Sequence, residues 1–199
     1  MTSSTLAVVA SGRPAIFQGR YGSRGNLELV TPSPEGGLVC CWFNSDPLGG
    51  PVTEPSIPAA TWSTGLHFAP GTTYDAVAGI QTRRGPDFLE LAATHAGGLH
   101  RWTWSPGPGF ELTGDLGGVT GRPYVIETPA GVEVGTTEHA DPAPPQVDAL
   151  AGDADAAAWC LSEMGHDQHL EIVVRHGDRL THHRVPLTSR TAGAAPSCC

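Results

Sequence analysis

The chain has 199 residues, of which 26 are Gly, 18 are Pro and only 16% are charged, and its formal net charge is −9. This length suits one well-buried domain, and the many turn-forming residues favour short strands over surface helices. A hydrophobic fraction of 39% excludes a disordered chain. Nucleic acid is excluded as a partner because phosphate binding needs a basic surface, and the eleven Lys and Arg residues are scattered.

Neither a membrane span nor a secretory leader is predicted at the start of the chain. The apolar stretch Leu6–Ala10 has only five residues and lacks a basic segment before it. We therefore expect a soluble, cytoplasmic protein without membrane contact. The five cysteines, Cys40, Cys41, Cys160, Cys198 and Cys199, have no zinc-binding spacing and fit reduced thiols.

Four imperfect copies of one sequence pattern fill the chain in order. Each copy begins with a short apolar strand, continues to a strand with a central Glu, and in most copies reaches a Gly turn followed by Leu and a third strand. The predicted copies span residues 12–70, 71–118, 119–152 and 153–187, and residues 188–199 form a flexible tail. The third copy is the shortest and decays into a Pro-rich loop near Pro142–Pro145, and no helical spacing is sustained anywhere.

The spacing of the repeated glutamates sets the size of the repeating unit. Glu28, Glu90, Glu133 and Glu171 are 62, 43 and 38 residues apart. This spacing suits one four-stranded propeller blade per copy. The sequence therefore predicts an all-β protein, a β-propeller of four blade repeats in a single domain, residues 1–187.

The two ends of the chain predict how the ring closes. Leu6–Ser11 precedes Gly12-Arg13-Pro14 in the same way that Leu112–Val119 precedes Gly121-Arg122-Pro123, so the N-terminal strand resembles the last strand of a blade. The fourth copy ends after its third strand, near Leu187. We expect the N-terminal strand to complete the last blade, which removes two exposed edges.

Three segments of the chain resemble a known family. Gly19–Asp46, Tyr74–Gly85 and Leu170–Arg184 are similar to the repeats of bacterial seven-bladed β-propeller lectins that bind fucose. Because this chain holds four copies and not seven, two alternatives stay open. Either the four blades close within a monomer, or two chains of a homodimer share a larger ring.

The resemblance implies sugar sites between neighbouring blades, lined by side chains that follow the Gly turn. Aligned on that turn, Trp42 and His182 match the family pattern, and Trp102 replaces another aromatic residue. Trp62 matches a family Trp on the outer strand. The implied ligand-binding residues are therefore Trp42, Trp62, Trp102 and His182, and the implied ligand is a glycan.

Three equivalent positions after the Gly turn carry different chemistry. Cys40, Arg101 and His182 occupy these positions in the first, second and fourth copies. In a closed ring the last and first blades are neighbours, so His182 and Cys40 would be adjacent, and an imidazolium lowers the pKa of a nearby thiol. These three residues are the candidates for catalysis, although core packing also explains Cys40.

The repeated glutamates and the nine histidines have simpler explanations than a metal centre. We expect each Glu to accept hydrogen bonds from the backbone or from a repeated Arg such as Arg13 or Arg122, and so to fasten blade to blade, because a feature of every blade is usually architectural. A ring of carboxylates that binds a cation is the alternative. No cofactor and no metal site are predicted.

Three functions remain open, and binding is slightly favoured over catalysis. The first is a carbohydrate-binding, lectin-like propeller. The second is a small enzyme or ligand-binding protein that uses one asymmetric pocket at the propeller channel, with a small molecule as its partner. The third is a protein-interaction scaffold. No nucleophile elbow, phosphate-binding Gly-rich loop or HExxH motif occurs in the sequence.

Overall fold

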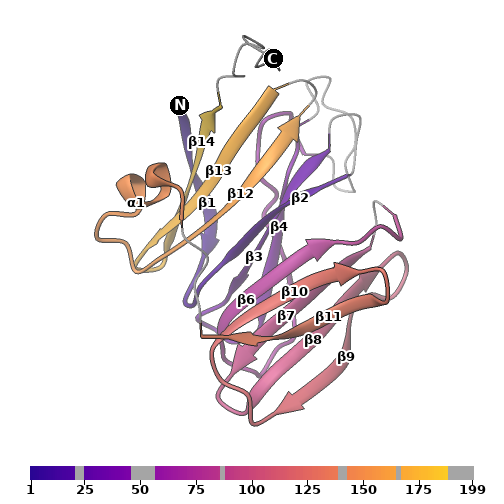
Figure 1. Cartoon of the computed structure of the whole chain (residues 1–199). Helices are drawn as coiled ribbons and strands as arrows, with labels where there is room; N and C mark the ends of the chain where they lie inside the picture. Colours follow the sequence, from indigo (N-terminus) through magenta and orange to yellow (C-terminus); the bar gives the residue numbers. More distant parts are fainter. Residues whose placement is uncertain (21–24, 46–56, 86–87, 139–142, 165–166, 188–199) are drawn as a thin grey trace, which may run out of the picture.

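The structure, a computed structural model, describes residues 1–20, 25–45, 57–85, 88–138, 143–164 and 167–187. Within these ranges the chain forms antiparallel strands in four separate sheets and one short helix (Figure 1). An all-β chain is therefore confirmed. No helix in the described ranges is long and apolar enough to cross a bilayer.

Each sheet takes its consecutive strands from one of the four sequence copies. Sheet I contains β2 (Ala15–Gly19), β3 (Asn26–Pro32), β4 (Leu38–Phe43) and β5 (Leu66–Phe68). Sheet II contains β6 (Tyr74–Gln81), β7 (Leu89–His95), β8 (Gly98–Ser105) and β9 (Gly109–Gly117). Sheet III contains β10 (Arg122–Thr128) and β11 (Gly131–Thr137). Sheet IV contains β12 (Ala156–Met164), β13 (Asp167–His176), β14 (Arg179–Pro186) and β1 (Thr2–Val9).

The N-terminal strand completes the last sheet, as the sequence predicts. β1 pairs antiparallel with β14, in register from Thr2 opposite Arg184 to Thr5 opposite Thr181. The pairing resumes at Val9 opposite Arg179 after an irregularity. The first and last strands of the chain thus cover each other's edges.

The third copy differs from the prediction of a Pro-rich loop without helix. After the two strands of sheet III, the chain forms α1 (Pro145–Ala151). Pro145 opens this helix, where a missing backbone N–H costs nothing and the fixed φ of proline suits the first turn. The buried Val147 attaches the helix to the apolar cluster of β13 and β12. The helix was missed because seven residues are too few to show a helical period.

The first strands of the sheets form a row. β12 lies beside β2, β2 beside β6, and β6 beside β10, and sheet I lies between sheets IV and II (Figure 1). Arg13 pairs in parallel with Ala76 at the start of this row. β10 and β12 lack a comparable contact within the described residues. A closed propeller ring is therefore not established.

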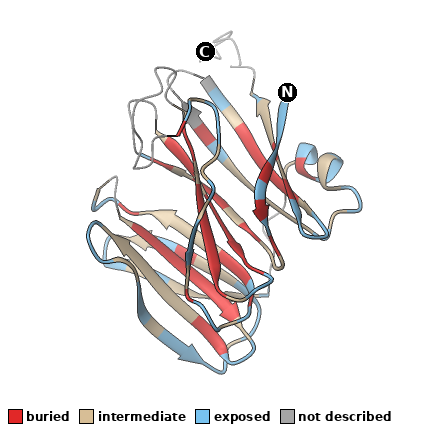
Figure 2. Cartoon of the chain, turned by 180° about the vertical axis from the view of Figure 1, so that it is seen from behind, coloured by how far each residue is buried: buried red, intermediate tan, exposed pale blue. Residues whose placement is uncertain are grey.

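The core consists of apolar clusters between successive sheets. Buried residues run along the middle strands, where the sheets face each other (Figure 2). One cluster joins sheets IV and I, a second joins sheets I and II, and a third joins sheets II and III. Gly79 permits the close approach of sheets I and II, because a Cβ there would lie 2.5 Å from the ring of Phe17. This packing brings β2 and β6 into close contact.

Candidate functional site

A cavity of about 420 Å³ lies where the first strands of all four sheets meet. Its lining comes from the start of β2, the middle of β6, β10, the last residue of β11 and the start of β12. The volume is within the range of small-molecule sites. Arg13 and Arg122 provide charge, Tyr124 and Trp159 provide aromatic surface, and no carboxylate belongs to the described lining.

Both arginines occupy the cavity because the copies place them at equivalent positions. Each belongs to a Gly-Arg-Pro triplet just before or at the start of a first strand. The backbone of Arg13 donates to the Asp75 carbonyl at 2.8 Å and accepts from the Val77 N–H at 3.1 Å. Gly12 is required beside it, because a Cβ there would lie 2.3 Å from the Asp75 carbonyl oxygen. The start of β2 is thus fixed against β6.

The two arginines create an electropositive cavity in an acidic protein. Burial lowers the pKa of Arg13, and the charge of Arg122 lowers it further. Arg13 Nη2 donates to the Ala157 carbonyl at 3.2 Å, which spans the cavity from sheet I to sheet IV. The Arg122 side chain is exposed and makes no hydrogen bond or ion pair with any residue that the structure describes. An anion placed between the two guanidinium groups would relieve their repulsion.

Two of the residues expected to bind sugar meet at the junction of sheets IV and I. The rings of Trp62 and His182 contact edge to face, with centroids 5.3 Å apart, and Phe43 lies 5.8 Å from His182. His182 is only 4% exposed, and its Nε2 lies 2.8 Å from an oxygen of the buried Glu171. The His182 ring is therefore packed and hydrogen-bonded to Glu171.

The other two expected sugar residues lie at the junction of sheets I and II. Trp102 packs edge-on against Phe68 of β5, with centroids 5.6 Å apart. Trp42 lies on the same face of sheet I as Cys40, because the two residues are two positions apart on β4. The described lining of the cavity between the first strands contains none of Trp42, Trp62, Trp102 and His182. The four residues do not form one site.

The expected pair of Cys40 and His182 is not formed. Cys40 packs in the cluster between sheets I and II, whereas His182 contacts Phe43 on the opposite face of sheet I. The Cys40 thiol lies 3.7 Å from a carboxylate oxygen of Glu28. Burial, followed by the charge of Glu28, raises the pKa of Cys40 well above its ordinary value. The thiolate needed for catalysis is therefore disfavoured.

The third candidate for catalysis, Arg101, pairs within its own sheet. Its Nε donates to Glu90 at 2.9 Å, and the Thr103 hydroxyl donates to the same carboxylate oxygen at 3.1 Å. Glu90 is 4% exposed. The pair stabilises sheet II on the face that meets sheet III.

Three of the four repeated glutamates make contacts within their own sheet, but their partners differ from those expected. These three, Glu28, Glu90 and Glu171, point toward the sheet that follows their own in the row IV, I, II, III. They accept hydrogen bonds from side chains on their own sheet, and not from Arg13 or Arg122. Glu133 is exposed on β11. Each therefore has local partners, which argues against a shared ring of carboxylates.

Arg13 and Arg122 were not predicted as site residues, because they were expected to donate hydrogen bonds to the repeated glutamates. The signal that could have found them is the Gly-Arg-Pro triplet, which recurs at the first strand of two copies. Comparison of the chain with protein-family models, curated proteins and solved structures found no match.

Proposed function

We propose that this protein binds a small organic anion, a carboxylate or phosphate with an apolar or aromatic portion, in the cavity between the four first strands. The observation that carries the proposal is the pair Arg13 and Arg122, which line one cavity without a carboxylate in its described lining. Charge-assisted bonds from a planar guanidinium suit both carboxylate and phosphate groups.

The rest of the lining supports an organic ligand over a bare inorganic ion. Tyr124 and Trp159 offer ring faces, and Ala78, Ala157 and the backbone at Gly79 make the walls small and apolar. Such a cavity binds the apolar part of a ligand by removing it from water, while the arginines fix its orientation. The proposal is a binding function, and no nucleophile lies in the described lining apart from Tyr124 and Thr137.

We also propose that the four sheets are the blades of an open, propeller-like ring, with β2, β6, β10 and β12 as its innermost strands. The cavity lining supports this arrangement because it draws on all four of these strands. The ligand site would then correspond to the channel of a propeller. Sheet III, with two strands, is the incomplete blade.

Paired ligands that differ only in charge test the proposed function. Isothermal titration calorimetry compares benzoate with benzamide, and phenyl phosphate with phenol. We expect the anionic member of at least one pair to bind one equivalent per chain and its neutral partner to bind at least tenfold more weakly. Equal binding of both members, or no binding of any, would refute the proposal.

Carbohydrate binding is the second candidate function. The observation that favours it is the contact between Trp62 and His182, which come from different sheets and meet at a junction where the lectin resemblance implies a sugar site. A glycan array tests it: binding that is lost in Trp62→Ala would support it, and folded protein that binds no glycan would exclude it.

A further inference from the structure

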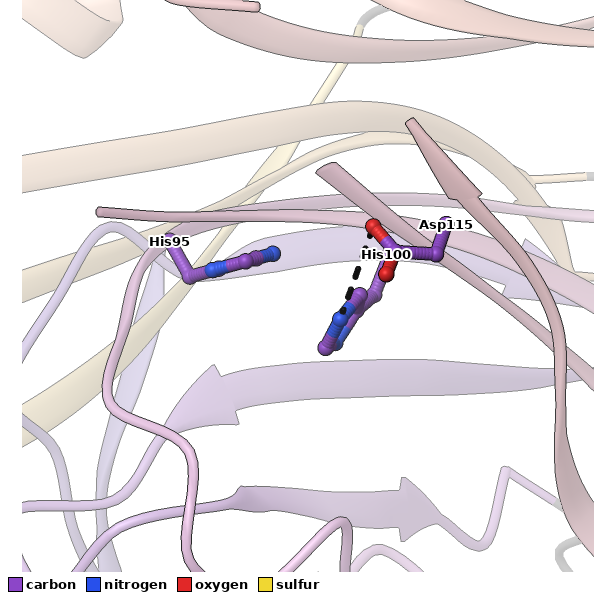
Figure 3. A group of neighbouring side chains, drawn as sticks. All are labelled: His95, His100 and Asp115. Carbon is purple, nitrogen blue, oxygen red and sulfur yellow. Dashed lines mark ion pairs between the residues drawn. The ribbon is translucent and has the colours of Figure 1, made fainter. Parts of the chain in front are cut away.

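Two histidines and an aspartate from three strands of sheet II gather at one end of the sheet. Figure 3 shows His95, His100 and Asp115 with their polar atoms turned toward one another. One ligand atom from each lies within 4.8 Å of the other two. The rings of His95 and His100 have centroids 4.2 Å apart, and His100 Nε2 lies 4.0 Å from Asp115 Oδ1.

The strand register explains why residues so far apart in sequence meet. His100 pairs with Ala93 on one side and with Asp115 on the other, and His95 lies two residues beyond Ala93. Directly paired residues and residues two apart share a face of a sheet. All three side chains therefore project from the same face, as does Tyr74, which pairs with His95.

Tyr74 holds His100 in the orientation that a metal ligand needs. The Tyr74 hydroxyl lies 2.8 Å from His100 Nδ1. When Nδ1 carries the proton and donates it to this hydroxyl, the lone pair is on Nε2, the atom that faces Asp115.

His95 contributes a buried nitrogen that has no partner among the residues that the structure describes. This atom, Nε2, lies on the side of the ring that points toward His100 and Asp115 (Figure 3). The Gly97 N–H donates to the other nitrogen, Nδ1, at 3.1 Å. Metal binding at Nε2 would move the ring proton to Nδ1. The exposed Gly97 N–H would then lose this acceptor and could donate to water instead.

We propose that His95, His100 and Asp115 form a binding site for a divalent transition-metal ion of the zinc type. Two imidazole nitrogens suit Zn²⁺ and are poor ligands for Mg²⁺ or Ca²⁺, and a carboxylate oxygen completes many zinc sites. Tetrahedral ligands of zinc lie roughly 3.4 Å apart, so the three groups must approach one another by about 1 Å. Asp115, with a side chain 64% exposed on the outer strand β9, is free to make this movement.

The site leaves one coordination position open. Three protein ligands with a fourth position for water or a ligand atom are typical of non-structural zinc sites. The metal site uses none of the residues that line the cavity with Arg13 and Arg122. The test of the metal site is therefore independent of the test of anion binding.

Calorimetric titration of the full chain with ZnCl₂ tests the site. We expect one equivalent of Zn²⁺ to bind, MgCl₂ not to bind, and both Asp115→Asn and His95→Ala to weaken zinc affinity at least tenfold. His67→Ala removes an exposed histidine on β5 and serves as the matched control, with unchanged affinity. A Cys198→Ser/Cys199→Ser protein must also bind zinc as the unchanged chain does.

The choice of variants keeps the test decisive. Asp115 is exposed, so Asp115→Asn should fold, and thermal unfolding without metal checks this for every variant. No binding by the unchanged chain would overturn the proposal. Binding that is equally tight in folded Asp115→Asn and folded His95→Ala would overturn it as well, because zinc would then be held elsewhere.

Discussion

Glu28 and Glu171 occupy the same position in two copies of the repeat, yet their pKa values move in opposite directions. Burial raises the pKa of Glu28 to about 7, although hydrogen bonds from Asn26 and Cys40 oppose the rise. Burial also acts to raise the pKa of Glu171, but His182, Arg184 and Ser162 outweigh it, and the pKa is lowered. The difference comes from the residues after the Gly turn, where one copy offers the Cys40 thiol and the other offers the His182 imidazole and the Arg184 guanidinium.

Glu28→Gln should remove a loss of stability that the unchanged chain shows as pH rises. Glu28 has a pKa near 4.5 in the unfolded chain and about 7 in the folded one. The free energy of unfolding should therefore fall by about 3 kcal/mol as pH rises across this interval. Urea unfolding of both proteins at pH 5 and pH 8 measures the difference. Glu133→Gln, at the exposed equivalent position, should keep the pH dependence of the unchanged chain; an identical dependence in Glu28→Gln would contradict the prediction.

Glu171→Ala should be among the most destabilising substitutions in sheet IV. It removes the acceptor of Ser162, His182 and Arg184, at 2.7, 2.8 and 2.8 Å, and leaves buried polar groups unpaired. Breaking such a buried cluster costs roughly 3–5 kcal/mol. Glu133→Ala should change the free energy of unfolding by less than about 0.5 kcal/mol. Chemical denaturation measures the free energy of unfolding of both variants. Similar losses in Glu171→Ala and Glu133→Ala would show that the buried cluster contributes little to stability.

The Glu171 cluster should also weaken in acid. Because the folded pKa of Glu171 lies below its ordinary 4.5, its contribution is present above that value and is lost as pH falls through the lowered folded pKa. The stability difference between the unchanged chain and Glu171→Gln should therefore shrink in acid. A difference that grows in acid would mean that the carboxylate is not paired as described.

The three described cysteines should resist alkylation while the protein is folded. Burial raises the pKa of Cys40 well above its ordinary value, and burial with a nearby glutamate raises those of Cys41 and Cys160 to about 12. In a Cys198→Ser/Cys199→Ser protein, iodoacetamide at pH 8 should modify none of them until urea unfolds the chain. Rapid modification of Cys40 in the folded protein, detected by mass spectrometry, would restore the case for an activated thiol.

Arg13→Gln and Arg122→Gln should separate structural from binding roles. Arg13 bridges sheets I and IV through the Ala157 carbonyl, so its loss should cost about 1 kcal/mol of stability. Arg122 is exposed, and its loss should leave the free energy of unfolding within about 0.5 kcal/mol of the unchanged chain. Thermal and urea unfolding test this, and the reverse order of stabilities would contradict it.

The sheets were predictable because their signals are local or repeated. Alternating apolar residues and the Leu-Glu pairs around Glu28, Glu90 and Glu171 mark the middle strands, and Leu6–Ser11 carries the last-strand pattern that pairs β1 with β14. Closure of a ring was predicted from the repeats but is not established, because a contact between β10 and β12 would depend on how the sheets pack and not on any local pattern.

The candidate site was harder to predict because it depends on which face of a strand meets which sheet. Cys40 and Cys41 are adjacent, and strand alternation turns Cys40 toward sheet II and Cys41 toward sheet IV, so the expected contact with His182 fails. His95, His100 and Asp115 show no metal-binding spacing in the sequence, and only the register of three strands brings them together.

Anion affinity in Arg122→Gln tests the central claim most directly, because this variant removes one charge from the cavity and little else. The probe is whichever of benzoate and phenyl phosphate the unchanged chain binds more tightly, and Arg179→Gln, at the exposed first residue of β14 and outside the lining of this cavity, is the control. A charge-assisted hydrogen bond contributes about 1.5–3 kcal/mol, so calorimetry should show Kd rising about 10- to 100-fold in Arg122→Gln and unchanged in Arg179→Gln. Equal affinity in all three proteins would contradict an anion site between Arg13 and Arg122.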